Sequence, residues 1–199
     1  MILALDCETS GLIPKGAVPG SAQFPWPVQI GAVLFGFDGH DRASFGSRIR
    51  ADGRTVSAGA TQVHGITSRD VGKSGVPEII GLGLICAFAA EAKFLTGYNV
   101  GFDRAILESA LIRLGKETKK LVRPGLEMVD LMPPATAACK LPSDREDGAY
   151  KFPRLSEALT IIRKERPRKG HDALSDARSA KRLFLSLKAR GYLDIAEAA

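Results

Sequence analysis

The sequence is poor in cysteine, with three in 199 residues, at positions 7, 86 and 139. They lie far apart and form no CxxC pair, so the sequence offers neither a disulfide framework nor the ligand spacing of a structural zinc site. We therefore expect Cys7, Cys86 and Cys139 to be small buried apolar side chains in a reducing compartment.

The sequence also lacks a long apolar run and a recognisable leader. The opening residues, MILALD, carry no positive charge, which argues against a secretory signal peptide. The longest weakly polar stretch, residues 76–90, is too short and too rich in glycine to span a bilayer. We therefore expect a cytoplasmic protein with no membrane partner.

No internal repeat and no low-complexity tract interrupts the chain, and its composition is that of a folded domain. Hydrophobic residues make up 45% and charged residues 25%, which is enough apolar material for a sizeable core. We predict one domain over residues 1–199, with its core at about 1–190. The net charge of +6 fits either an ordinary basic protein or one attracted to polyanions such as nucleic acid.

Apolar patterning predicts an α/β domain built around one sheet. The predicted strands cover residues 1–5, 28–37, 42–50, 94–98 and 128–131. The predicted helices cover residues 77–90, 102–114, 155–162 and 172–190. The first three strands follow one another closely and suggest an antiparallel meander, while residues 13–27 and 133–150 are predicted to be irregular because of their breakers and polar residues.

Two carboxylates stand together at the end of the first predicted strand. Asp6 and Glu8 are two residues apart, so their side chains point to the same face of the sheet. Such a pair repels itself and loses hydration unless a cation neutralises it, and oxygen ligands of this kind suit Mg²⁺ or Mn²⁺. The alternative is a solvated strand end with ordinary surface acids.

Further titratable residues come at or just before the starts of two predicted helices. Asp103 follows a buried strand directly, where an acid is also favoured by the helix dipole alone. Asp172 is a plausible N-cap of the last helix, which places Asp176 in its second turn and His171 just outside it. Each of these features by itself is also explained by ordinary helix capping.

Taken together, the segments resemble the DEDDh family of exonucleases, which includes the proofreading epsilon-type domains, ribonuclease T and oligoribonuclease. The DxET[TS]G motif is met from Asp6 to Gly11, the Asn–x–x–Phe–Asp pattern from Asn99 to Asp103, and HxAxxD from His171 to Asp176. Two shorter segments agree, at residues 29–33 (QIGAV) and 64–67 (HGIT), although the glutamate usual in the family just after the first of them is absent here.

The resemblance implies a ribonuclease H-like fold and a metal-dependent 3′→5′ exonuclease. The fold is a three-layer α/β arrangement, with a mixed sheet of about five strands, the first three antiparallel, and helices on both faces. The enzyme would remove nucleoside monophosphates from a 3′ end, with DNA as the first choice of substrate. Two divalent cations, Mg²⁺ or Mn²⁺, would be its cofactors.

The resemblance also assigns roles to the five reactive side chains. Asp6 would bridge both cations, Glu8 and Asp176 would bind mainly the cation on the nucleophile side, and Asp103 would act partly through water. His171 would be the general base, because an unperturbed histidine pKa of about 6.5 suits proton transfer near neutral pH.

Substrate contacts follow from the same resemblance. Main-chain amides near Thr9 and Ser10 would hold the sugar of the terminal nucleotide. Leu12 would wedge against a base, or else be a core leucine. His64 and Asn99 would contact substrate or make structural hydrogen bonds.

Three aromatic residues and a basic run also lie near these motifs. We expect Phe102 to pack in the core. Phe24 and Trp26 either stack on a base or pack over the sheet. The basic run at residues 163–169 is either a solvated loop or a phosphate clamp beside the site.

The expected partner is nucleic acid, as the 3′ end of single-stranded DNA or RNA, with a polymerase or a second copy of the chain as a possible protein partner. A non-catalytic nucleic-acid-binding or polymerase-associated module of the same fold is the main alternative function. A ribonuclease H-like endonuclease is another. The sequence does not choose between DNA and RNA, between single and double strands, or between proofreading, repair and turnover.

Overall fold

The computed structural model describes residues 1–121, 123–144, 147–166 and 172–195. Its strands are β1 (Ile2–Thr9), β2 (Pro27–Phe35), β3 (Asp41–Arg48), β4 (Phe94–Gly97) and β5 (Glu127–Asp130). Its helices are α1 (Ala58–His64), α2 (Ser68–Lys73), α3 (Glu78–Glu91), α4 (Val100–Arg113), the 3₁₀ turn η1 (Thr118–Lys120), α5 (Met132–Cys139), α6 (Leu155–Arg163) and α7 (Ala173–Ala189).

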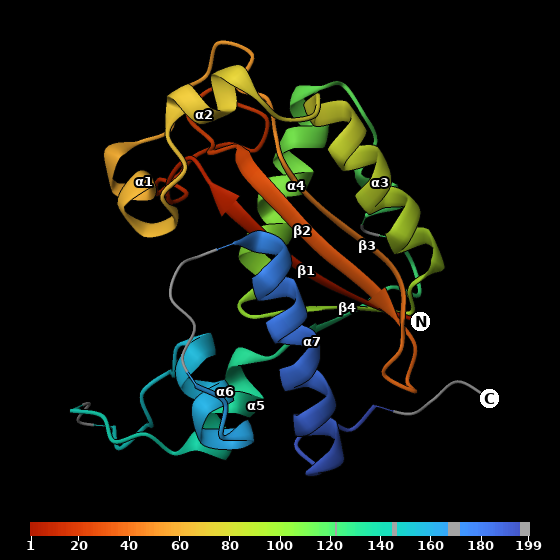
Figure 1. Ribbon diagram of the computed structural model, residues 1–199, viewed down its shortest axis with the longest axis vertical. Helices are drawn as coiled ribbons and strands as arrows, with labels where there is room; N and C mark the ends of the chain where they lie inside the picture. Colours follow the sequence, from red (N-terminus) through yellow and green to blue (C-terminus); the bar gives the residue numbers. More distant parts are fainter. Residues whose placement is uncertain (122, 145–146, 167–171, 196–199) are drawn as a thin grey trace.

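The strands form one mixed sheet in the order β3-β2-β1-β4-β5. The first three strands pair antiparallel, whereas β4 runs parallel to β1 and β5 runs parallel to β4. Figure 1 shows α7 crossing one face of this sheet and α3 and α4 covering the other. The predicted three-layer architecture and the antiparallel start of the sheet are confirmed.

Side chains of β1 alternate between the two faces of the sheet, and each face carries a hydrophobic core. Leu3, Leu5 and Cys7 join the core beneath α3 and α4, whereas Ile2 and Ala4 join the core beneath α5, α6 and α7. Because side chains alternate along a strand, Asp6 and Glu8 continue the second series and point to the α7 face. The pattern of β1 thus aims both acids at the last helix.

The first turn of α7 lies directly on β2 at a glycine. A Cβ added to Gly31 would stand 2.1 Å from the main-chain carbon of Ala173 and 2.2 Å from the main-chain nitrogen of Leu174. On β3, a Cβ at Gly46 would stand 2.7 Å from the side chain of Leu174. These two glycines let the helix approach the sheet more closely than any side chain would allow.

Replacing Gly31 by Ala is therefore expected to lower the free energy of unfolding by at least about 2 kcal/mol, since the clash is with main-chain atoms that cannot move alone. Thermal or urea unfolding measures the loss. Gly83→Ala is the matched control, because nothing lies within 4 Å of its Cβ and alanine is the better helix former by about 1 kcal/mol. An equally stable Gly31→Ala protein would contradict this account of the docking of α7.

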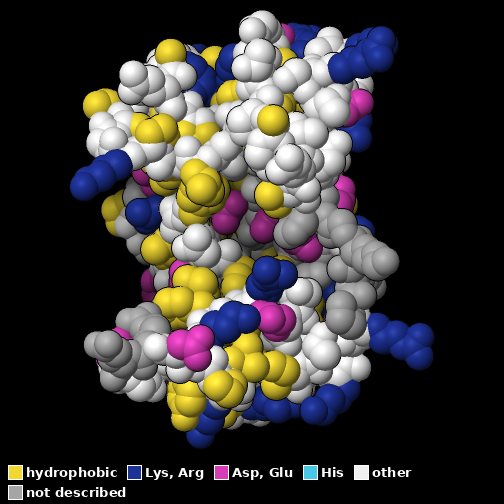
Figure 2. Space-filling model, turned by 90° about the vertical axis from the view of Figure 1, so that its left-hand side faces the viewer, with side chains coloured by type: hydrophobic (Ala, Val, Ile, Leu, Met, Phe, Trp, Pro, Cys, Tyr) yellow, Lys and Arg dark blue, Asp and Glu magenta, His cyan; other side chains and the backbone are white. Residues whose placement is uncertain are grey.

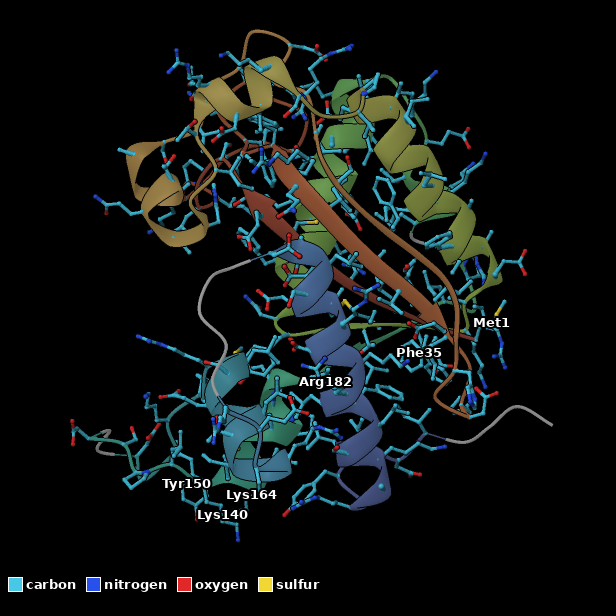
Figure 3. All side chains as sticks on the ribbon, in the orientation of Figure 1. Met1, Phe35, Lys140, Tyr150, Lys164 and Arg182 are labelled. Carbon is cyan, nitrogen blue, oxygen red and sulfur yellow. The ribbon has the colours of Figure 1, made fainter. Side chains whose placement is uncertain are left out.

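The other half of α7 is fixed by an ion pair and by aromatic packing. Arg182 Nε lies 3.2 Å from Glu165 Oε1, just beyond the end of α6. The ring of Phe184 meets that of Phe35 edge to face at 5.8 Å. Figure 3 shows Arg182 on the lower half of α7, toward α6. The helix is thereby held along its length against both β2 and α6.

Three helices depart from the sequence-based prediction. The prediction that residues 133–150 are irregular is wrong at its start, where α5 carries its two prolines in the first turn, the place where a missing N–H costs nothing. The helices α1 and α2 were not predicted. They are short and are defined by side-chain caps at Ser57 and Thr67.

The segment at residues 13–27 has no regular structure before Pro27, as predicted, and its two aromatic side chains are buried. Trp26 donates from Nε1 to the carbonyl of Thr55 at 3.1 Å, and the guanidinium of Arg54 covers its ring at 4.4 Å. Phe24 is 5% exposed. Both rings therefore pack in the protein interior, so neither offers a free face for a base.

The cysteines are free thiols, with Cys7 and Cys86 buried and Cys139 half-buried. This matches the expected role of small interior side chains, most closely for the first two. Among the described residues, no helix is long and apolar enough to cross a lipid bilayer.

Candidate active site

Three of the predicted acids meet at one place on the α7 face of the sheet. Carboxylate oxygens of Asp6, Glu8 and Asp176 all lie within 4.8 Å of one another. The first two come from β1 and the third from the first turn of α7, one turn earlier than predicted. Figure 2, which views the molecule from the left-hand side of Figure 1, shows Asp and Glu side chains gathered in a hollow near the middle of that face.

The fourth acid, Asp103, reaches the site from the opposite layer. The strand β4 pairs with β1 at Ile2, Leu3 and Ala4, and after it ends the chain turns at Asn99 into α4. Asp103, in the first turn of α4, accepts a hydrogen bond from the main-chain N–H of Cys7 at 2.9 Å. That bond brings the Asp103 carboxylate to β1 at Cys7, the residue that separates Asp6 from Glu8 in the sequence.

Burial and mutual repulsion raise the pKa values of these acids. For Asp6 the pKa lies well above its usual value because of desolvation first, and then because of the charges of Asp103, Asp176 and Glu8. Desolvation, followed by the charges of Asp176 and Asp172, raises the pKa of Glu8 to about 7. Burial also raises the pKa of Asp103, although the N–H of Cys7 partly opposes the rise.

This arrangement fits divalent cations. Near neutral pH, four clustered carboxylates cannot all be ionised at low cost unless positive charge neutralises them. The donors are hard oxygens, which suit Mg²⁺ or Mn²⁺ better than soft metals. Asp6, Glu8 and Asp176 are close enough together to share a cation, and Asp103 has one oxygen engaged by Cys7.

A cavity of about 570 Å³ opens beside Glu8 and is lined mainly by apolar side chains. Leu12 stands at its rim and is 85% exposed, so the reading of Leu12 as a core leucine is wrong. Phe102 lines the same cavity and is half-buried. The expectation that Phe102 lies in the core is therefore also wrong, because the first turn of α4 faces the site.

His64 lines this cavity too, and both of its ring nitrogens are engaged. The main-chain N–H of Ile66 donates to Nδ1 at 3.0 Å, and Nε2 lies 3.2 Å from the carbonyl oxygen of Thr9. This pairing fits the neutral ring with its proton on Nε2, which donates to Thr9. His64 thus ties the end of β1 to α1, which supports the structural reading of this residue.

The loop after β1 is braced by further hydrogen bonds. The hydroxyl of Thr9 donates to the carbonyl of Gly11 at 2.8 Å, and the hydroxyl of Ser10 accepts from the N–H of Trp26 at 3.1 Å. The main-chain N–H of Ser10 donates to the carbonyl of Trp26 at 3.0 Å. The Ser10 amide is therefore already used within the protein, which disfavours the predicted contact of that amide with a sugar.

Asn99 has a structural place at the junction of β4 and α4. Its φ of 61° is left-handed, a conformation that asparagine tolerates better than most residues. Its main-chain N–H donates to Asp130 Oδ1 at 2.9 Å, and the N–H of Met132 donates to the same oxygen. Asp130 thereby fixes the turn that delivers Asp103.

The predicted general base, His171, lies outside the described residues, as do Arg168 and Lys169 of the basic run. Within the described part of that run, Arg163 donates to Glu165 at 2.5 Å and to the hydroxyl of Ser186 at 2.7 Å. Arg163 is thus engaged within the protein, at the junction of α6 and α7.

Two residues that the sequence did not single out for function lie against the acids. Asp172 caps α7 as predicted, accepting from the N–H of Ser175 at 2.9 Å, and its charge acts on Glu8 and Asp6. Gln29 on β2 bonds to Asp172 and to the N–H of Ala173. The QIGAV segment was the only sequence signal for Gln29, because contacts this distant in sequence leave no local pattern.

Comparison with known proteins places this geometry among nucleases. The family model described as "RNase_T: Exonuclease" matches residues 3–184. E. coli exonuclease I in complex with a 5cy-dT13 oligonucleotide is 21% identical with a TM-score of 0.72, and its zinc-bound complex with single-stranded DNA is 20% identical with a TM-score of 0.74. Exonuclease I from Methylocaldum szegediense is 20% identical with a TM-score of 0.72.

These three matches cover 95% of this chain and 40% of the respective exonuclease I chain. The chain therefore spans less than half the length of the solved exonucleases that it matches, and at this identity the likeness concerns the fold. A search of curated proteins found no match.

Proposed function

Because the chain belongs to the exonuclease family, of the DEDDh 3′→5′ type, we propose that it hydrolyses phosphodiester bonds one at a time from a nucleic-acid 3′ end and releases nucleoside monophosphates. The observation that carries the proposal is the meeting of Asp6, Glu8 and Asp176 within 4.8 Å. Acids from the first strand and the last helix have no structural reason to be forced together, since they destabilise one another.

In the proposed mechanism, Asp6, Glu8, Asp103 and Asp176 would hold two divalent cations, Mg²⁺ or Mn²⁺. Bound cations would stabilise negative charge on the phosphate and make water a better nucleophile. Asp6, on which the charges of Asp103, Asp176 and Glu8 all act, would help to hold both cations, with Glu8 and Asp176 beside it. Asp103, engaged by Cys7 through one oxygen, would act from the edge of the site.

The cavity beside Glu8 would receive the terminal nucleotide. Its apolar lining suits the faces of a base and a sugar, and the exposed Leu12 at its rim is placed to press against a base. Phe102 and His64 would form the opposite wall. Since the Ser10 amide is engaged by Trp26, the main chain near Thr9 is the better candidate for a contact with the sugar.

His171 would take the proton of the attacking water. It immediately precedes Asp172, the N-cap of α7, and lies five residues before Asp176. Neither of the other two histidines suits this role, because His64 has both ring nitrogens engaged and His40 lies in the β2–β3 turn.

Single-stranded DNA is the substrate that we propose first. Two of the similar exonuclease I structures are complexes with dT13 and dA16 oligonucleotides, and the net charge of +6 favours encounter with a polyanion. A polymerase or a second copy of the chain as partner, and a cytoplasmic location, stay predictions.

A substrate panel tests the proposal. Purified protein is incubated with 5′-labelled single-stranded DNA, single-stranded RNA and blunt duplex DNA, each with Mg²⁺, Mn²⁺ or EDTA. The expected result is a ladder that shortens stepwise from the 3′ end of the DNA strand, depends on the added metal and is absent for Asp103→Ala.

The same panel separates the alternative functions. Cleavage of a circular single strand would indicate an endonuclease, because an exonuclease requires an end. Metal-independent binding of oligonucleotide, with no shortening of any substrate in either metal, would indicate a non-catalytic module and overturn the proposal.

A further inference from the structure

Gln29 joins the sheet to the first turn of α7 through both ends of its carboxamide. Its Nε2 donates to Asp172 Oδ2 at 2.8 Å, and its Oε1 accepts from the main-chain N–H of Ala173 at 3.2 Å. The first N–H groups of a helix have no partner within the helix. Gln29 satisfies one of them and at the same time holds the side chain that caps the helix.

Gln29 also stands next to the acids. It pairs with Glu8 across the β1–β2 ladder, and directly paired residues of an antiparallel ladder project from the same face. The carboxamide therefore lies beside the Glu8 carboxylate, on the face that α7 covers. One side chain thus connects the strand that pairs with β1 to the helix that carries Asp176.

At this point α7 and β2 lie so close together that the helix cannot move toward the strand. Two residues along β2, Gly31 meets the main chain of Ala173 and Leu174 with no room for a Cβ. Close contact at Gly31 sets the distance between helix and strand, but a glycine cannot set the rotation of the helix. The two directional bonds of Gln29 do so.

Rotation of α7 decides where Asp176 points. Asp172 and Asp176 are four residues apart, so they lie on nearly the same side of the helix. Fixing Asp172 against Gln29 consequently turns Asp176 toward Asp6 and Glu8, where its carboxylate is found. The carboxamide of Gln29 carries a donor and an acceptor side by side, so it can donate to an aspartate and accept from an amide N–H at the same time.

We propose that Gln29 is a positioning residue of the nuclease site, which orients the first turn of α7 so that Asp176 completes the cation-binding set with Asp6 and Glu8. The inference rests on the proposed function. Gln29 would act through Asp172 and the N-terminus of α7, so that one side chain of β2 anchors the last helix.

The test compares Gln29→Met, which keeps the size but loses both bonds, with Gln29→Glu, which keeps the acceptor but places a second carboxylate against Asp172. Mn²⁺ binding is measured by calorimetry on the protein without substrate, and kcat and KM are measured on a single-stranded oligonucleotide. Loss of an indirect support of this kind typically costs about 10- to 100-fold in metal affinity or activity. We expect losses of that size in Mn²⁺ affinity and kcat for both variants, with KM changed by less than about threefold.

Val33→Ala is the control for general destabilisation. Val33 lies on the same strand and is buried in the α7 interface, but its side chain makes no hydrogen bond. Assayed well below its unfolding temperature, this variant should keep wild-type Mn²⁺ affinity and kcat.

The outcomes distinguish the inference from the function on which it rests. Wild-type Mn²⁺ affinity and kcat in Gln29→Met would overturn the positioning role while leaving the nuclease assignment intact. Equal losses of Mn²⁺ affinity and kcat in Val33→Ala would also overturn the positioning role. They would show that any loosening of α7 against the sheet is enough to impair the site. A wild-type protein that neither binds Mn²⁺ nor cleaves any substrate would overturn the proposed function itself.

Discussion

Replacing Asp6 by Asn is expected to abolish cleavage for practical purposes, with kcat reduced by about 10³-fold or more. The change keeps the shape of the side chain and removes a carboxylate on which the charges of Asp103, Asp176 and Glu8 all act. Loss of about 4 kcal/mol of charge stabilisation in the transition state corresponds to roughly 10³-fold in rate. Initial rates on a 5′-labelled single strand, at saturating Mn²⁺, measure the effect.

The same variant should be more stable than the wild type when metal is absent. The raised pKa values mean that, between pH 4.5 and about 7 for Glu8, the folded protein binds more protons than the unfolded chain. Stability therefore falls as pH rises through this window, and the raised pKa of Asp6 adds to the fall. Asp6→Asn removes one of these acids, so its unfolding temperature in EDTA should decline less between pH 5 and pH 8.

Added Mg²⁺ or Mn²⁺ should reverse this order, since cations that bind only the folded protein stabilise it. At pH 8 the wild type should gain more from metal than Asp6→Asn. Asp52→Asn is a suitable control, because Asp52 is an exposed turn residue that pairs with Arg50. An active Asp6→Asn enzyme, or a metal-free wild type as stable at pH 8 as at pH 5, would contradict the assignment of these acids.

Replacing His171 by Ala is expected to lower kcat by about 10²- to 10⁴-fold, the usual contribution of a general base. The KM for oligonucleotide and the affinity for Mn²⁺ should change little, because the histidine is proposed to act on the attacking water and not on the strand or the cations. Single-turnover cleavage rates and Mn²⁺ titration measure the two effects separately.

His40→Ala is the matched control for the loss of a histidine. His40 is exposed in the β2–β3 turn, where its ring lies 3.4 Å from Asp38. This variant should cleave like the wild type. A fully active His171→Ala enzyme would show that another group, or water alone, accepts the proton.

Local patterns predicted most of the sheet and the longer helices, because burial there follows a simple period. They failed at α5, where Pro133 and Pro134 suggested a break but begin the helix. They also failed at α1, a helix of seven residues with no buried side chain and hence no apolar pattern to find.

The acid cluster could be expected from the sequence through the resemblance of its motifs, and the two-residue spacing of Asp6 and Glu8 gave their common face directly. The exposure of Leu12 and the position of Phe102 beside the cavity could not be predicted from the sequence. A large apolar residue is expected in the core unless the fold places it at the surface. The QIGAV segment drew attention to the strand of Gln29, but the contacts of Gln29 could not be predicted, because its partners lie almost the whole chain away.

The division of the acids between β1 and α7 has a consequence for synthesis of the protein. A ribosome produces Asp6 and Glu8 early and Asp176 late, and the last acid arrives only when α7 has emerged and docked at Gly31. Nascent and prematurely terminated chains thus carry an incomplete set of cation ligands. In the proposed nuclease, the cation-binding set is therefore completed only once α7 has docked against β2.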